Sequence, residues 1–285
     1  MVYLNELTIY VNGTGLCDNL YAKQFPYFLD KGEDLDYTEL SLFLKYIANS
    51  SISNIRICGY NIFQYPQWNK LLDALDRIHA MKSLYVYCAQ LEDFQDKYRI
   101  ALAEQFEYVI IVDREHPLEE SVMANVLEKR LHVKWSFYVT SKDEYYIIQE
   151  QIERYHLDKY SVKPVFTGDN LDFFSEFVFL TEEDIRNTRL NKRQIFANQI
   201  INTNDFGKFT ISPQGTVFVN INFPSCGKIA IDSIHSLIRY ELINGDLWFR
   251  TRSEQPCSDC KYQWLCPSPS NYELVLNKQN LCYTE

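Results

Sequence analysis

Four of the eight cysteines of this 285-residue chain lie near its C-terminus, at Cys257, Cys260, Cys266 and Cys282. The first two form a C-x2-C pair, which places two thiolates on one tight turn where they can bind a metal together. The other two complete a four-sulfur ligand set once the chain folds back. Four thiolates suit a tetrahedral zinc ion or an iron–sulfur cluster, and ligand type alone does not separate the two. The tail is therefore predicted to bind metal.

The remaining cysteines do not share this pattern. Cys58 and Cys88 end apolar segments that are predicted to be strands, so both are interpreted as small core residues. Cys17 stands alone in a loop, and the role of Cys226 stays open.

A second group with possible chemistry is Asp113 and His116 in "VDREHPLEE", after the fourth predicted strand. In a barrel, catalytic residues lie at this end of the strands. Ordinary loop polarity and helix capping explain the same residues more simply. Lys163 lies inside the sixth predicted strand, and no metalloprotease, hydrolase or nucleotide-binding motif accompanies these residues.

The formal charge of −10 argues against binding to nucleic acid or to anionic membranes. No signal peptide and no apolar run of about 20 residues is present, so a cytoplasmic protein without a membrane span is expected. In that compartment clustered cysteines are more often metal ligands than disulfides.

The elements that must position these residues follow a regular rhythm. Short β-rich segments occur at residues 7–11, 54–58, 83–88, 108–112, 133–139 and 161–166, and from the second onwards they start 25 to 29 residues apart. This spacing is typical of βαβ units in a parallel sheet. Six units are too few for a closed eight-stranded barrel, which leaves an open partial barrel or a doubly wound sheet.

Apolar residues at helical spacing predict helices between the strands, over residues 40–47, 68–78, 91–98 and 148–155. Ser141 and Glu144 are predicted to form a capping box before the last of these.

The rhythm changes after about residue 180. One polar helix is expected over residues 182–196, followed by a hairpin that turns at residues 212–215 and a helix that ends at Gly245. We expect two packed domains, 1–190 and 191–285. Four basic residues of the polar helix form a patch that is either a solvated face or a surface for an acidic partner: Arg186, Arg189, Lys192 and Arg193.

The tail pattern C-x2-C-x5-C followed by a lone cysteine resembles a SPASM domain, the auxiliary iron–sulfur module of radical S-adenosylmethionine (SAM) peptide-modifying enzymes. The resemblance implies that the four tail cysteines ligate one auxiliary 4Fe–4S cluster. Two further cysteines of the family pattern fall on Asn220 and Ser270, so the first auxiliary cluster of the family is expected to be lost, while the ligand set of the second is complete. The spacing matches this cluster-binding module better than a common zinc ribbon, so a cluster is favoured and zinc remains the alternative.

The strand rhythm is similar to the partial (β/α)6 TIM-like barrel of radical SAM enzymes, whose C-x3-C-x2-C loop follows the first strand. Here the three positions are Thr14, Asp18 and Tyr21, with Cys17 between them. One thiolate cannot hold a 4Fe–4S cluster. The family's Gly-Gly-Glu motif, whose glutamate binds the amino group of SAM, ends here at Tyr60. The resemblance therefore implies a degenerate barrel that does not bind SAM.

Four segments narrow the resemblance to pseudo-radical-SAM proteins of Bacteroidales peptide-modification systems: "YLNELTIYVNG", "NIFQY", "INTNDFGKFTI" and "CPSPSNYE". Members carry additional sequence before the first strand, so this chain is expected to be a shortened form. The resemblance implies a non-catalytic accessory protein that partners a true radical SAM maturase or its small precursor peptide. Two alternatives stay open: a zinc-stapled interaction module, and an enzyme or electron-relay protein of another class that uses the barrel face.

Overall fold

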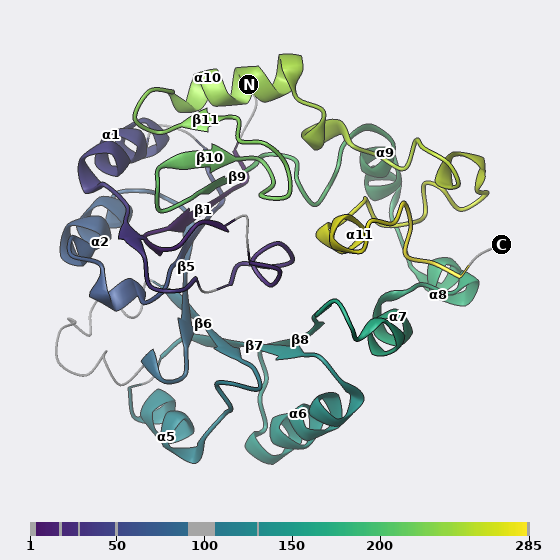
Figure 1. Cartoon of the computed structure of the whole chain (residues 1–285), viewed down its shortest axis with the longest axis horizontal. Helices are drawn as coiled ribbons and strands as arrows, with labels where there is room; N and C mark the ends of the chain where they lie inside the picture. Colours follow the sequence, from purple (N-terminus) through teal and green to yellow (C-terminus); the bar gives the residue numbers. More distant parts are fainter. Residues whose placement is uncertain are drawn as a thin grey trace.

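The computed structural model describes residues 4–16, 19–27, 29–48, 51–90, 106–129 and 131–283. Its centre is a nine-stranded sheet (Figure 1). Six strands follow the order β1, β4, β5, β6, β7, β8, and every adjacent pair among them is parallel. Their bounds are Glu6–Tyr10, Asn54–Cys58, Met81–Tyr87, Glu107–Val112, Val133–Val139 and Tyr160–Pro164. All six predicted strands are thus confirmed, with ends that move by two residues at most.

The sheet does not close on itself but curves as an incomplete ring, whose open side faces α7, α8, α9 and α11 (Figure 1). An open partial barrel is therefore the correct one of the two architectures that the rhythm allowed. Beyond β1 the sheet continues with β9 (Lys208–Ile211), which is parallel to β1, and then with antiparallel β10 (Thr216–Phe218) and β11 (Gly227–Lys228). The predicted hairpin is confirmed as β9 and β10. This hairpin extends the barrel sheet, although it lies beyond the predicted domain boundary near residue 190. The division into domains 1–190 and 191–285 stays a prediction.

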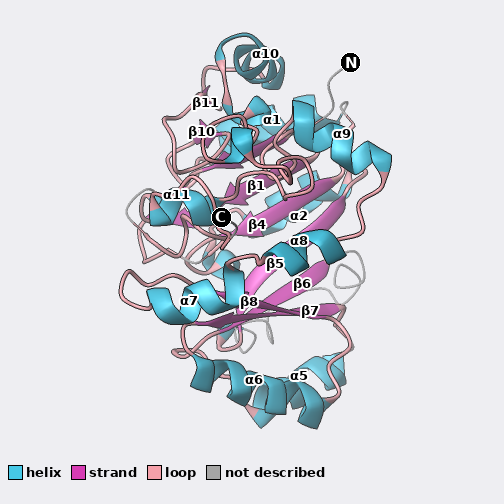
Figure 2. Cartoon of the chain, turned by 90° about the vertical axis from the view of Figure 1, so that its right-hand side faces the viewer, coloured by secondary structure: helices cyan, strands magenta, loops and turns pink. Residues whose placement is uncertain are grey.

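Helices cover the outer face of the sheet, as Figure 2 shows for α5 and α6 beside β7. They are α1 (Tyr37–Ala48), α2 (Trp68–Asp76), α5 (Glu120–Lys129) and α6 (Lys142–Tyr155). These confirm the predicted helices except 91–98, which lies outside the described residues. A short hairpin of β2 (Asn12–Gly13) and β3 (Glu33–Asp34) and a 3-10 turn, η2 (Ile62–Gln64), complete this half.

The predicted capping box before α6 is half right. The Ser141 hydroxyl accepts a hydrogen bond from the Glu144 N–H at 3.2 Å, as expected. The Glu144 carboxylate, however, accepts from the N–H and the hydroxyl of Thr140, one residue earlier.

Several short helices lie across the open side of the barrel: α7 (Leu171–Val178), α8 (Glu182–Asn187), α9 (Lys192–Ile200) and α11 (Asn271–Leu276). The single polar helix expected over residues 182–196 is wrong, because it is two helices. Asn191 caps α9 with its own capping box to Gln194, and this cap requires an extended backbone at Asn191. The expected helix ending at Gly245 is confirmed as α10 (Ile234–Asn244), followed by the turns η3 (Leu247–Phe249) and η4 (Cys257–Asp259).

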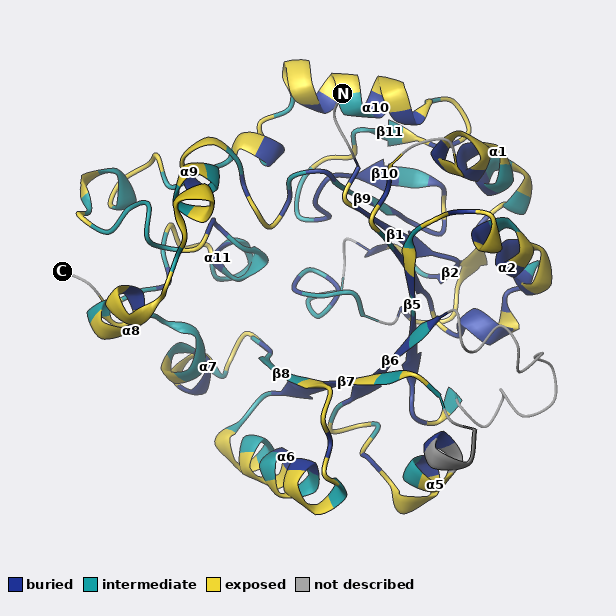
Figure 3. Cartoon of the chain, turned by 180° about the vertical axis from the view of Figure 1, so that it is seen from behind, coloured by how far each residue is buried: buried dark blue, intermediate teal, exposed yellow. Residues whose placement is uncertain are grey.

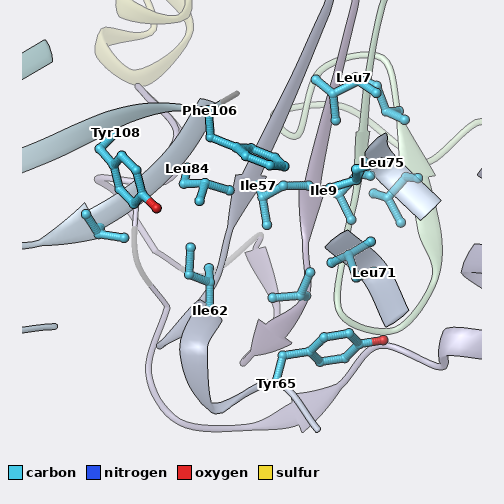
Figure 4. Close-up of a cluster of buried hydrophobic side chains, with 14 of the residues drawn as sticks. Leu7, Ile9, Ile57, Ile62, Tyr65, Leu71, Leu75, Leu84, Phe106 and Tyr108 are labelled. Atoms are coloured by element: carbon cyan, nitrogen blue, oxygen red, sulfur yellow. The ribbon is translucent and has the colours of Figure 1, made fainter. Parts of the chain in front are cut away.

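Alternation along the strands divides the apolar side chains between two cores. Leu7, Ile9 and Ile57 point outward and pack against Leu71 and Leu75 of α2 (Figure 4). The inner face carries a smaller cluster that includes Tyr10, Cys58, Tyr85 and Tyr138. Figure 3 shows that most residues of the central strands are buried (dark blue), whereas the helices around them also carry exposed residues.

Within the described ranges, no helix combines the length and the apolar character needed to cross a membrane.

Candidate metal centre and barrel mouth

All four tail cysteines line one cavity of about 360 Å³, together with Leu180 and Arg252 among others. Cys257 and Cys260 stand at the two ends of the turn η4, where the Cys260 N–H donates to the Cys257 carbonyl at 3.1 Å. The structure therefore brings together the residues that the sequence singled out, although they span 26 positions. Whether they ligate metal remains a prediction.

Two distant segments hold the other cysteines in place. Asn198 of α9, whose side chain is buried, donates to the carbonyls of Trp264 and Cys266 at 3.2 and 3.0 Å. Cys282 pairs with Leu180 in an isolated parallel bridge, where the Leu180 N–H donates to the Leu281 carbonyl at 2.9 Å. Because both anchors come from before residue 200, the cavity does not depend on the tail alone.

The basic patch of the polar helix is partly used within the chain. Arg186 pairs with Glu182 and donates from Nε to the Tyr262 hydroxyl at 2.8 Å, and Glu182 also accepts from Tyr262 and Lys261. These contacts fasten α8 to the cysteine loop. All four residues of the patch are exposed, Arg186 included; the others are Arg189, Lys192 and Arg193.

Two donors face the sulfur atoms. Arg252 places Nη1 3.8 Å from the Cys257 sulfur, and the Tyr262 N–H donates to the Cys260 sulfur at 3.4 Å. Burial raises the pKa of the Cys257 thiol and raises the pKa of Cys266 to about 11. Arg252 counteracts both shifts, because a cation favours a nearby thiolate. Arg252 could not be singled out from the sequence, since nothing in its neighbourhood distinguishes it from any other arginine.

Four thiols with cationic and N–H donors are suitable ligands for an iron–sulfur cluster. Among the described residues, no three His, Cys, Asp or Glu side chains gather closely enough to hold one metal ion. The four sulfurs thus border a cavity and do not converge on one point.

A polar network occupies the two positions where the SPASM pattern would have further cysteines. Asn220 donates to Asn271 at 2.6 Å and to the buried carboxylate of Asp205 at 2.9 Å. Ser270, directly before Asn271, caps α11 in a capping box with Glu273. The two positions are therefore neighbours in space, and hydrogen-bonding groups stand there.

The mouth of the barrel is filled by the loop after β1. Phe25 stacks on Tyr138 with ring centres 5.0 Å apart, and the Tyr138 hydroxyl donates to the Pro26 carbonyl at 2.9 Å. Gln24 exchanges two hydrogen bonds with the backbone of Phe166. We call residues 19–27 the mouth loop.

The residues predicted to replace the catalytic cluster and SAM ligands lie around this loop. Thr14 donates its N–H to the Asp30 carbonyl at 3.0 Å, while Tyr21 and Tyr60 line one cavity. Cys17 and Asp18 lie outside the described residues. At the described positions, Thr14, Tyr21 and Tyr60, the mouth therefore presents a hydroxyl and two phenols in place of thiolates and a carboxylate.

Asp113 and His116 do form a pair. The Asp113 carboxylate, 9% exposed, lies 3.0 Å from Nδ1 of His116 and accepts a hydrogen bond from the Tyr27 hydroxyl at 3.2 Å. The His116 ring stacks on Tyr87 with centres 3.9 Å apart. The sequence indicated the pair but not Tyr27, which reaches it from 86 residues away.

Lys163 projects into the barrel, with Nζ 5.3 Å from the ring centres of both Phe25 and Tyr138. Burial, with the nearby charges of Arg56 and Lys134, lowers its pKa to about 8.

Several solved structures have an architecture similar to that of this chain. No protein-family profile and no curated protein matches the chain. Streptococcus suis SuiB bound to S-adenosylmethionine is similar over 98% of this chain and 75% of its own, with a TM-score of 0.63 and 14% identity. SuiB bound to the precursor peptide SuiA gives a TM-score of 0.59 and 13% identity, over 98% and 74% of the two chains. For anSMEcpe with bound AdoMet the TM-score is 0.59 and the identity 11%, over 95% and 92%. The chain therefore has the partial-barrel α/β fold of radical SAM proteins.

Proposed function

We propose that this chain is a non-catalytic, cytoplasmic accessory protein of ribosomal-peptide modification, which binds a radical SAM maturase or its precursor peptide. Its tail would hold one 4Fe–4S cluster through Cys257, Cys260, Cys266 and Cys282. The observation that carries the proposal is the contrast between two sites: four thiols line the tail cavity, whereas Tyr21 and Tyr60 line the barrel mouth where cluster and SAM ligands would stand. Similarity to SuiB, which has been solved with a precursor peptide, supports the link to peptide modification.

The breadth of the tail cavity supports a cluster over a single zinc ion. Zinc binds four thiolates at about 2.3 Å, so their sulfurs must meet around one point. A cavity of about 360 Å³ bordered by the four cysteines leaves room for a larger group. When bound, a cluster would cross-link the tail and could carry an electron. The protein's own groups would position it: Arg252 and the Tyr262 N–H would donate to the sulfurs.

The catalytic half of the proposal is tested by incubating anaerobically reconstituted protein with SAM and dithionite. We expect no 5′-deoxyadenosine above the level of protein-free controls, and no SAM binding by calorimetry. Production of 5′-deoxyadenosine that persists after further purification would contradict a non-catalytic role.

The partner half is tested by co-purification with the products of neighbouring genes, among which a radical SAM maturase and a small precursor peptide are expected. Retention of at least one of them is expected. If neither is retained by the reconstituted protein, the accessory role fails.

A further inference from the structure

A second cavity, of about 560 Å³, opens where four barrel strands end. The mouth loop contributes Tyr21 and Tyr27, the segment after β4 contributes Tyr60, and the end of β5 contributes Tyr87. His116 follows β6 and completes this side. In parallel barrels the carboxyl ends of the strands are where ligands bind. We call this the tyrosine cavity.

The tyrosine rings that line the cavity pack against one another. Tyr21 and Tyr27 pack with ring centres 4.9 Å apart, and Tyr27 meets Tyr87 edge to face at 6.0 Å. Burial raises the pKa of both Tyr27 and Tyr87, so the two phenols remain uncharged at neutral pH. Asp113 fixes His116 through Nδ1, which leaves Nε2 as the ring nitrogen available to a ligand.

Carboxylates give the cavity a negative charge. The exposed carboxylates of Asp30 and Glu115 line it, and the carboxylate of Asp113 lies directly behind His116. Neither lysine nor arginine is among its lining residues in the described part of the chain. Neutral aromatic faces combined with carboxylates form a site for a cation, because the ring quadrupole and the carboxylates attract the same charge.

We propose that the tyrosine cavity binds a lysine or arginine side chain of the precursor peptide. The peptide part of this inference rests on the function proposed above. The cation would lie against Tyr60, which is 37% exposed, and near the Glu115 carboxylate. The amide group of Asn19, which also lines the cavity, can hydrogen-bond to peptide backbone.

The test measures binding of three synthetic peptides to the full chain by saturation-transfer NMR and calorimetry: acetyl-Gly-Lys-Gly-amide and its norleucine and glutamate counterparts. We expect binding of the lysine peptide only, weakening as salt increases. Tyr60→Ala should weaken it about three- to thirtyfold, the range of a cation–π contact, and Glu115→Gln should weaken it severalfold. Tyr46→Ala and Glu153→Gln change exposed residues outside the cavity and should leave binding unchanged.

The proposal is overturned if the lysine peptide does not bind, if the norleucine or glutamate peptide binds equally, or if the cavity variants behave like the controls. This failure is distinct from failure of the accessory role. Loss of co-purification with intact lysine-peptide binding would remove the partner proposal, and with it the precursor peptide as the source of the cation, but would leave the cation site itself. Intact co-purification without lysine-peptide binding would overturn only the cavity.

Discussion

Arg252 connects three segments of the tail through its guanidinium group. It pairs with Glu273 at 2.7 Å, donates to the Pro267 carbonyl at 2.6 Å and lies 3.8 Å from the Cys257 sulfur. The side chains of Arg252 and Glu273 are only 9% and 4% exposed. Removing one member of a buried ion pair is costly because it leaves the other charge without a partner.

Arg252→Gln should therefore destabilise the tail by about 3–5 kcal/mol and reduce iron retention after reconstitution. Limited proteolysis of residues 250–283 and iron analysis measure the two effects. Arg252→Gln combined with Glu273→Gln should recover part of the stability, because no unpaired charge remains. The exposed Arg239→Gln serves as control, and an Arg252 variant that matches it would contradict this role.

Lys163 has a pKa that is lowered to about 8, mainly because the side chain is buried. Below pH 8 the lysine is charged in both the folded and the unfolded chain, so the cost of burying the charge is fully present. Between pH 8 and about 10.5 the folded chain has lost the proton and the unfolded chain retains it, so the free energy of unfolding rises with pH.

Lys163→Met should thus be more stable than the natural chain below pH 8, by about 1–3 kcal/mol. The advantage should shrink towards pH 10.5. Urea unfolding at pH 7 and pH 10 measures it, with the exposed Lys192→Met as control. A stability difference that is independent of pH would count against the buried ammonium.

Among the elements of the fold, the mouth loop connects the barrel to the tail. Phe25 contacts Tyr138 and meets Tyr272 of α11 edge to face at 5.6 Å, so the loop packs against both β7 and the tail. Its position depends on long-range contacts, with Gln24 bonded 142 residues away at Phe166. No local pattern in the sequence could predict that packing.

Phe25→Ala should loosen the mouth loop because both aromatic contacts are lost, at a cost of about 2–4 kcal/mol. Hydrogen exchange of residues 19–27 should rise while exchange in β4 to β7 stays slow. Phe196→Ala, at a side chain that is 59% exposed on α9, is the matched control. Unchanged exchange in the mouth loop would show that these contacts do not hold it.

The sequence predicted the repeated elements well and the non-local pairings poorly. The six strands carry their own apolar patterns, so their positions could be predicted from residues 7–166 alone. The parallel pairing of β1 with β9 joins segments 200 residues apart and has no local signal. The break at residues 188–191 was not predicted, because helix-forming residues flank Asn191 on both sides, although Asn191 and Gln194 have the spacing of a capping box.

Across the whole molecule, direct contacts join the tail to the barrel and to the segment after α7. Tyr272 donates to the Pro164 carbonyl at the end of β8, at 2.8 Å, and meets Phe174 of α7 edge to face. Leu180 and Cys282 join the end of the chain to the segment after α7. A group bound by the four tail cysteines would therefore stabilise the tail and also the helices that lie across the open side of the barrel.

The site itself was predictable in part. The spacing of the cysteines indicated the four thiols, and the structure brings them to one cavity. Arg252 and Asn198, which orient that cavity, were not predictable, because an isolated arginine or asparagine acquires its role only from three-dimensional neighbours.

We propose one cluster in the tail and no catalytic cluster in the barrel. The iron, zinc and acid-labile sulfide content of anaerobically purified and reconstituted protein tests this most directly. We expect about four irons and four sulfides per chain, lost in Cys260→Ala and retained in Cys226→Ala. The Cys260 variant should also lose protease resistance in its C-terminal region. Zinc without iron or sulfide, or iron retained fully by Cys260→Ala, would overturn the proposed tail cluster.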